Sequence, residues 1–298
     1  MKKIKKAFMY LKGLITILIH TSPIKMLKLA SGSDVVIKQL DEYGFSIFLR
    51  CDDYAVAKPI LFTQHYEENV AKTLQRYLKL DSVFIDIGAN VGFFSLLAGK
   101  NSPKGKVYSF EPDSNNYRLL RSSVIYNDLD QIVETYPFAV SDKNETLVLS
   151  DLGSARNTGA RFTAKNKEQL KPLVHGPNPV FGNVKAVSID DFIKKQNVDL
   201  IKIDIEGYEP FAFRGMESTI KTFKPVIVTE FAPGNLRSVG LMKPEVFIDY
   251  IRDLGYSINL IKASGDTVLI TEKSSCFVNK CISQSCHHVD LLLLPEEQ

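Results

Sequence analysis

The sequence predicts a doubly wound α/β fold, in which helices cover both faces of a mostly parallel β-sheet. From residue 82 onward, short apolar runs rich in β-branched residues alternate with helical patterns. Such alternation is typical of a parallel sheet with crossover helices. In addition, a glycine-containing turn directly follows the first of these runs and opens a helical pattern, as at the ligand-binding edge of doubly wound sheets.

Strands are expected where an apolar run is short, and helices where apolar residues recur at helical spacing. The expected parallel strands are Val83 to Ile87, Lys106 to Phe110, Val133 to Val140, Leu200 to Ile205 and Pro225 to Phe231. The expected helices are Glu67 to Leu80, Val91 to Lys100, Ser114 to Asn127, Pro210 to Phe223 and Pro244 to Gly255. Three strands joined without helices are expected to end the sheet in antiparallel pairing: Tyr256 to Ile261, Thr267 to Thr271 and Val289 to Leu294.

Three parts are expected along the chain. Residues 1–30 form a basic, apolar helix, residues 31–66 a β-rich segment, and residues 67–298 the main domain. Glycine and proline interrupt the main domain at residues 151–187. Long irregular inserts in compact domains are usually either functional or disordered, and we expect this one to be a lid that faces the substrate.

Composition excludes some classes of partner. The 298 residues are 45% hydrophobic, enough to bury a full core. The net charge is +3, but the first thirty residues hold seven lysines and no acid, so subtracting these seven charges leaves −4 for the rest. A nucleic-acid-binding domain needs a basic surface on its folded part, and we therefore expect no nucleic-acid partner. Four cysteines are too few for a disulfide scaffold and fit a reducing cytoplasm.

The lysine-rich N-terminus allows two interpretations. Its apolar run from Ala7 to Ile19 is thirteen residues long, short of the roughly 20 that span a bilayer. A basic, apolar helix can instead lie on a membrane surface, which would give residues 1–20 of a cytoplasmic protein a peripheral contact with the inner membrane face. Alternatively, this helix packs on its own domain.

Residue types that bind metals gather near the C-terminus, in the run Cys276-x4-Cys281-x4-Cys286-His287-His288. Structural zinc sites, however, usually pair cysteines two to four residues apart. A loop with free thiols is the alternative interpretation.

The turn from Asp86 to Gly92 is the first candidate binding site. Because glycine lacks a Cβ, the backbone at Gly88 and Gly92 can turn tightly and approach a nucleotide-type ligand. Glu111 lies 23 residues after Gly88, at the tip of the next expected strand. A carboxylate at that position can accept hydrogen bonds from both hydroxyls of a ribose.

The charge of this loop separates two classes of cofactor. A dinucleotide enzyme, such as an NAD(P)-dependent oxidoreductase, usually carries G-x-G-x-x-G, whereas this chain has Gly88-x-x-x-Gly92 with Asp86 before the turn. Burying a carboxylate beside two phosphates would cost several kcal/mol, whereas beside an ammonium and a sulfonium it can be favourable. The loop therefore favours a cationic ligand over a pyrophosphate.

Ordered motifs over roughly residues 60 to 262 resemble the FkbM family of methyltransferases. They are Asp86 to Gly92, Phe110-Glu111-Pro112, Ala139-Val140-Ser141-Asp142 and Leu200 to Glu209. The resemblance implies the Rossmann-like, seven-stranded class I methyltransferase fold and S-adenosyl-L-methionine as methyl donor, usually for O-methylation of sugars or other secondary-metabolite hydroxyls. By position, it implies that Glu111 holds the cofactor ribose and that four residues line its methionine side: Asp86, Gly88, Asn90 and Gly92. Asp142 would either contact the adenine edge or cap a turn.

Charged residues end two neighbouring expected strands. Strand alternation places Lys202, Asp204 and Glu206 on one face, and Glu230 ends the next strand. An internal parallel strand is normally apolar on both faces. These charges therefore indicate either a ligand site at the carboxyl edge or an ion pair between Lys202 and Asp204 that steadies the strand.

Methyl transfer to a hydroxyl requires alignment and the removal of one proton. We expect Asp204, Glu206 or Glu230 to act as general base, or a divalent metal ion bridging two of them to activate the oxygen. The acceptor would be a small molecule or a glycan. His175 and residues 157–161 of the expected lid either contact it or belong to an ordinary surface loop. A non-catalytic nucleotide-binding module is the alternative from another class, and the presence of these carboxylates argues against it.

Overall fold

The computed structural model describes residues 34–151, 157, 159, 161–174, 176, 178–194, 196–284 and 287–296. The expected N-terminal helix and His175 lie outside these residues. Within the described part of the chain, no helix is both long enough and apolar enough to cross a membrane.

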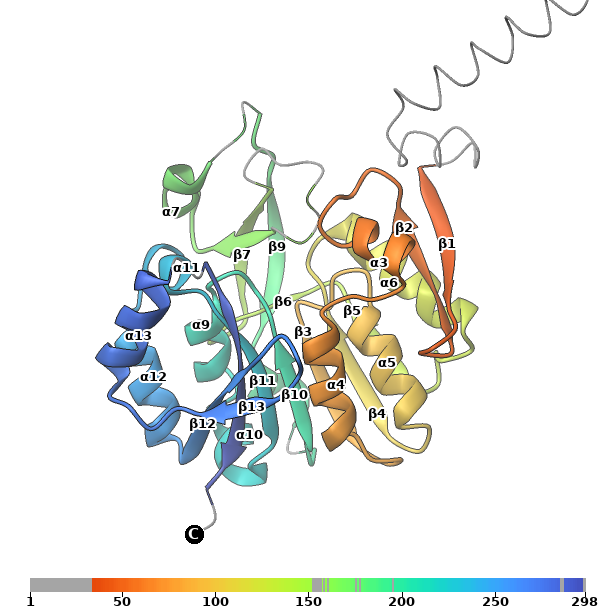
Figure 1. Ribbon diagram of the computed structural model, residues 1–298. Helices are drawn as coiled ribbons and strands as arrows, with labels where there is room; N and C mark the ends of the chain where they lie inside the picture. Colours follow the sequence, from red (N-terminus) through yellow and green to blue (C-terminus); the bar gives the residue numbers. More distant parts are fainter. Residues whose placement is uncertain are drawn as a thin grey trace, which may run out of the picture.

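The main sheet brings together the strands that the alternation predicts (Figure 1). Five strands pair in parallel: β3 (Val83–Ile87), β4 (Lys106–Phe110), β5 (Val133–Tyr136), β10 (Leu200–Ile203) and β11 (Val226–Phe231). The antiparallel pairs involve the last strands: β12 (Tyr256–Ile261), β13 (Thr267–Leu269) and β14 (Val289–Pro295). The predicted mostly parallel sheet with antiparallel last strands is confirmed, and β13 adds a short eighth strand at one edge.

The strand order places a ligand-binding edge between β3 and β10. The order is β13-β12-β14-β11-β10-β3-β4-β5. The chain runs outward from β3 to β5 and then returns to β10 on the other side of β3. The carboxyl ends of β3 and β10 therefore flank the topological switch point, where open α/β sheets bind ligands.

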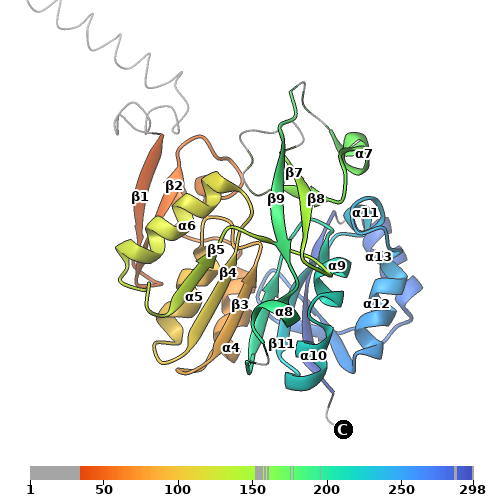
Figure 2. The same ribbon diagram turned by 180° about the vertical axis from the view of Figure 1, so that it is seen from behind.

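Helices cover both faces of the main sheet (Figures 1 and 2). One face packs against α4 (Glu68–Tyr77), α5 (Phe93–Asn101) and α6 (Ser114–Tyr126). The other packs against α8 (Ile189–Phe192), α9 (Glu209–Arg214), α10 (Glu217–Phe223), α11 (Pro233–Ser238), α12 (Pro244–Asp253) and α13 (Ser274–Ser283). Alternation along β3 sends Phe84 into the first core and Ile85 into the second. The sheet is doubly wound, as predicted.

The expected β-rich segment contains a hairpin of β1 (Val35–Leu40) and β2 (Phe45–Arg50), followed by α3 (Ala57–Thr63). Gly44 ends the hairpin turn with a φ of 69°, in the left-handed region that glycine adopts without strain. Because β2 packs against α5 and α6, the hairpin adds a layer outside these two helices.

Among its described residues, the stretch expected as an irregular insert contains regular secondary structure. It contains β8 (Phe162–Ala164), α7 (Lys167–Leu170), a 3-10 turn (Lys171–Leu173) and β9 (Phe181–Val187). These strands join β6 (Ala139–Val140) and β7 (Glu145–Ser150) in a second sheet of order β6-β9-β7-β8, which stands beyond one end of the main sheet (Figure 2). The pairing partners are distant in sequence, as Ser150 with Phe181, so local patterns did not indicate them.

Three local expectations are wrong. The helix α13 separates β13 from β14, where strands without a helix were expected, and it holds Cys276 and Cys281 in place of a loop. The strand expected from 133 to 140 divides at Pro137 into β5 and β6, because proline cannot donate to a strand ladder. The helix expected from 210 to 223 divides at Gly215 into α9 and α10.

Candidate active site

A cavity of about 450 Å³ lies at the carboxyl ends of β3, β4, β10 and β11. Six of the nine residues expected at a site line it: Gly88, Asn90, Glu111, Asp204, Glu206 and Glu230. Tyr66 and Glu67, which precede α4, also line it and were missed, since no sequence pattern connects them to the strand ends. The volume lies within the range of about 300–1,000 Å³ that is usual for ligand pockets.

The glycine loop is hydrogen-bonded to the end of β4. Gly88 and Asn90 have left-handed backbones, with φ of 80° and 52°. The amides of Gly88 and Ala89 both donate to the carbonyl oxygen of Phe110 at 3.0 Å. A Cβ on Gly88 would lie 1.9 Å from the carbonyl oxygen of Asp204. Glycine is therefore required here by the close approach of β10 as well as by the turn.

Asp86 and Gly92 support this loop from beneath and do not line the cavity. Asp86 is fully buried, and its Oδ2 accepts a hydrogen bond of 2.6 Å from Ser95 Oγ. Burial raises the pKa of Asp86, against the opposing effect of the nearby Lys202 ammonium. At Gly92, where φ is 96°, a Cβ would lie 2.5 Å from Leu120 Cδ1, so glycine allows α5 to pack closely on α6.

Asp142 also lies away from the cavity wall. Its Oδ2 is 3.8 Å from Lys165 Nζ and 3.9 Å from Arg214 Nε. The expected contact with an adenine edge thus has no counterpart in the cavity lining.

Of the C-terminal cysteine and histidine run, Cys286 lies outside the described residues. Within those residues, no group of three or more His, Cys, Asp or Glu side chains is arranged to hold a metal ion.

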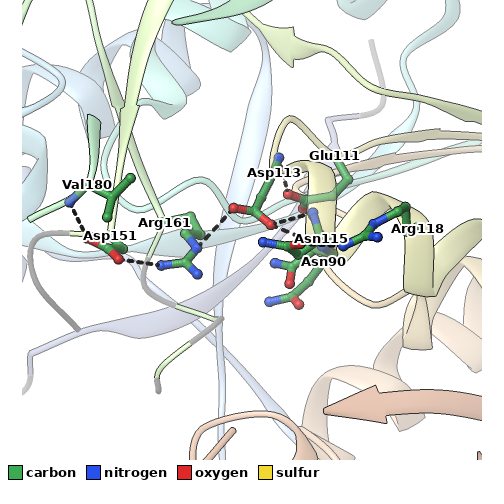
Figure 3. A network of polar contacts seen from close by, with 9 residues as sticks. Asn90, Glu111, Asp113, Asn115, Arg118, Asp151, Arg161 and Val180 are labelled. Carbon is green, nitrogen blue, oxygen red and sulfur yellow. Dashed lines mark hydrogen bonds and ion pairs between the residues drawn. The ribbon is translucent and has the colours of Figure 1, made fainter. Parts of the chain in front are cut away.

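Glu111 presents a fixed carboxylate to the cavity (Figure 3). Its Oε2 accepts a hydrogen bond from the Asn90 amide and its Oε1 one from the Asp113 amide, both at 2.8 Å. Each carboxylate oxygen can accept a further hydrogen bond. Burial raises the pKa of Glu111 to about 8, although the two amides oppose this shift. The side chain is thus oriented to accept hydrogen bonds from two neighbouring hydroxyls.

A buried lysine stands among the carboxyls at the end of β10. Lys202 Nζ donates to Asp204 Oδ2 at 3.1 Å and lies 4.6 Å from the centre of the Phe94 ring. Lys202 is also the register partner of Asp86 on β3. The ion pair that the sequence left open as an alternative is present, and Asp204 lines the cavity at the same time.

The charge on Lys202 is stabilised by its neighbours. Burial by itself lowers the pKa of this ammonium, yet the net shift is upward. The carboxylates of Asp204, Glu67 and Asp86 cause the upward shift. Burial in turn raises the pKa of Glu67 to about 7, while Lys202 opposes that rise. The single positive charge of Lys202 therefore offsets the negative charges of several neighbouring carboxyls.

Glu206 reaches the cavity by a turn and not by strand alternation. The strand β10 ends at Ile203, and Glu206 has a left-handed backbone with φ of 56°. The expectation that it continues the face of Lys202 is therefore wrong. Its Oε2 accepts a hydrogen bond of 3.2 Å from Asn235 Nδ2 on α11. Burial, and then the charge of Asp204, raise its pKa to about 8.

Glu230 also lines the cavity. His288 Nδ1 lies 3.8 Å from its Oε1, and among the described residues its buried Oε2 has no hydrogen-bond partner. Burial first, and then the charges of Asp204 and Glu206, raise its pKa well above the usual value. Carboxyls with such raised pKa values are suited to accept a proton near neutral pH.

A family model matches more than half of the chain, and the curated relatives are methyltransferases. Residues 86–258 match the family model described as the methyltransferase FkbM domain. The chain is similar to methyltransferase sdnD of Sordaria araneosa, with 23% identity over 175 residues, 51% of this chain and 68% of that protein. It is 22% identical over 150 residues to methyltransferase 1 of Beauveria bassiana (strain ARSEF 2860), covering 46% of this chain and 59% of that protein.

A solved structure of similar kind is methyltransferase FkbM from Methylobacillus flagellatus KT. The two chains share 16% sequence identity with a TM-score of 0.45, over 72% of this chain and 44% of that one. The present chain therefore spans less than half the length of that structure and less than two thirds of the Beauveria bassiana protein.

Proposed function

Because this chain belongs to the methyltransferase FkbM family, we propose that it transfers a methyl group to a hydroxyl of a sugar, a glycan or a secondary metabolite. The family makes it a methyltransferase that uses S-adenosyl-L-methionine, in place of the oxidoreductase or binding module that the sequence left open. One observation carries the choice of a hydroxyl: Glu206 and Glu230, both with raised pKa values, line the same cavity as Glu111.

The cavity wall fits this cofactor. Glu111 would accept hydrogen bonds from the ribose hydroxyls, and the backbone of residues 88–90 would lie against the methionine part. When bound, the cofactor supplies a methyl carbon attached to a positively charged sulfur. The protein's share is to hold the acceptor oxygen in line with that carbon.

The charges of the cavity also suit a cationic ligand. Glu67, Asp204 and Glu230 line it, with Lys202 as the buried cation among them. A positive charge placed beside carboxyls lowers their pKa values. Binding of the cofactor would therefore favour the ionised form of the carboxyls that must act as base. Cofactor binding and base activation support each other in this arrangement.

A hydroxyl acceptor loses its proton as its oxygen attacks, and a carboxylate can take that proton. Glu230 Oε2, without a hydrogen-bond partner among the described residues, has free capacity to do so. Glu206 stands at the same side of the cavity and is the second candidate. Carboxylates also accept hydrogen bonds from the other hydroxyls of a polyol, which favours a sugar-like acceptor.

The site of action is part of this proposal. Five lysines in residues 1–20 support peripheral contact of this segment with an anionic membrane, at about 1 kcal/mol for each basic residue near the surface. A lipid-linked glycan at the inner membrane face would fit both this contact and the polar cavity.

The test separates binding from proton removal. Glu206→Gln and Glu230→Gln keep the shape of the side chains, and we expect both to bind S-adenosylhomocysteine with wild-type affinity in calorimetry. With methyl-labelled cofactor and glycan fractions as acceptor, the variant of the base should lose roughly 10²-fold or more in turnover. Glu168→Gln on α7, which pairs with Lys171 at the surface, is the matched control and should behave as wild type. Full activity of both cavity variants would contradict the proposed role of these carboxyls.

A further inference from the structure

Arg161, immediately before β8, stands between the second sheet and the cofactor side of the cavity (Figure 3). We infer that Arg161 is a positioning residue for cofactor binding, because it fastens the second sheet to the turn that holds the Glu111 carboxylate. This inference rests on the proposed function, which assigns Glu111 to the cofactor ribose.

The guanidinium of Arg161 lies between two carboxylates from different sheets. Its Nε is 3.3 Å from Asp113 Oδ2, in the turn after β4 of the main sheet. Its Nη1 is 3.7 Å from Asp151 Oδ2, directly after β7 of the second sheet. Asp151 Oδ1 in turn accepts a hydrogen bond of 2.9 Å from the Val180 amide, just before β9. The arginine therefore joins the main sheet to two strands of the second sheet.

Asp113 links Arg161 to Glu111, because it contacts both residues. Its side chain caps α6 by accepting hydrogen bonds from the amides of Asn115 at 2.9 Å and Asn116 at 3.0 Å. Its own amide donates to Glu111 Oε1 at 2.8 Å. Any displacement of the Asp113 turn would thus move one of the two donors that orient the Glu111 carboxylate.

Burial requires that the charge of Arg161 be paired. The side chain of Arg161 is 11% exposed, and those of Asp113 and Asp151 are 13% and 9% exposed. A charge this buried is tolerated only when it is paired. The planar guanidinium places one nitrogen at ion-pair distance from each carboxylate, without a hydrogen bond to either among the described residues, whereas a lysine has a single ammonium. The positive charge of Arg161 also lowers the pKa of Glu111, against the stronger effect of burial.

The location of Arg161 gives this connection a function. Arg161 lines both the cofactor cavity and a neighbouring cavity of about 590 Å³ formed with the second sheet. The same side chain therefore supports the turn that orients Glu111 and contacts the second sheet. Binding of a ligand to Glu111 would therefore depend on the second sheet as well as on the main sheet.

The test uses S-adenosylhomocysteine as the probe and the full-length chain. Arg161→Met should weaken its binding by about 10-fold in calorimetry, within the usual range of coupling between sites. The same variant should also need a higher pH for tight binding than the wild type, because Glu111 loses a nearby positive charge. Arg161→Lys keeps that charge and should keep the wild-type pH profile while binding more weakly than wild type. Arg118→Met is the control, since Arg118 contacts only Asn115 in the same network and is exposed (Figure 3).

The outcomes are distinct. Wild-type affinity and pH profile in Arg161→Met would overturn the inference, while binding to the wild-type chain would leave the proposed function intact. If Arg161→Met does not fold, Arg161→Lys decides, and wild-type affinity in that variant would overturn the inference. A wild-type chain that does not bind S-adenosylhomocysteine would instead refute the proposed function itself.

Discussion

Replacing the buried lysine of the cavity should destabilise the protein in a pH-dependent way. Methionine at position 202 has a similar length but no charge. The Lys202 side chain is 5% exposed and lies 3.1 Å from Asp204, whose side chain is 29% exposed. Removing one partner of a buried ion pair costs about 3 to 5 kcal/mol. Because Asp204 is partly hydrated, we expect Lys202→Met to cost about 3 kcal/mol at about pH 8.

The sign of the pH dependence follows from the neighbouring carboxyls. Lys202 lowers the pKa values of Glu67, Asp86 and Asp290, which burial raises above their usual values of 4.5 for Glu67 and 3.8 for the two aspartates. Without the lysine these pKa values rise further in the folded state. A carboxyl with a higher pKa in the folded than in the unfolded state makes stability fall as the pH rises between the two values.

The cost of Lys202→Met should therefore shrink on acidification. At about pH 5 the carboxyl of Glu67, with a pKa of about 7, is protonated and needs no cation, so its share of the cost disappears while that of the Asp204 pair remains, and we expect about 2 kcal/mol. Urea denaturation followed by far-UV circular dichroism measures both values. The control Lys221→Met removes an exposed pair with Glu217 and should cost at most about 0.5 kcal/mol at either pH. An equal cost of Lys202→Met at both pH values would refute this reasoning.

Three further predictions concern separate parts of the chain. Glu111→Gln should weaken S-adenosylhomocysteine binding by about 1 to 3 kcal/mol. It should also abolish the rise in wild-type affinity that we expect up to pH 8, the region where Glu111 ionises; a rise that persists would exclude Glu111 as its cause. Gly88→Ala should cost about 2 to 5 kcal/mol in thermal unfolding, since a Cβ would meet Asp204 at a φ of 80°, and an unchanged melting temperature would contradict the described turn. Deleting residues 2–20, which contain five lysines, should reduce sedimentation with anionic liposomes and leave S-adenosylhomocysteine binding intact; equal sedimentation would remove the membrane contact from the proposal.

The main sheet could be predicted well because its signals are local. Strands β3, β4 and β12 begin and end where their apolar runs do. The second sheet could not, since its strands are short and its pairs join residues far apart, such as Glu145 with Ala186. Its glycine and proline residues then favoured an irregular lid over a sheet.

The site was predictable to the extent that strand ends mark it. Glu111 and Glu230 follow from their positions at the ends of β4 and β11. The pattern of the glycine loop, however, does not distinguish residues that face a ligand from those that pack beneath it, as Asp86 does. Glu67 reaches the cavity from a distant segment, and only the packing of α4 on the sheet brings it there.

The central claim is that this chain methylates a hydroxyl, and the position of a transferred methyl group tests it most directly. The protein would be incubated with S-adenosyl-L-methionine carrying a labelled methyl group and with lipid-linked and soluble glycan fractions. Mass spectrometry and NMR would then locate the label. The account predicts a methyl ether on a hydroxyl oxygen, formed by the wild type and lost in the double variant of Glu206→Gln and Glu230→Gln. Label on nitrogen or sulfur, or an ether formed equally well by the double variant, would contradict it.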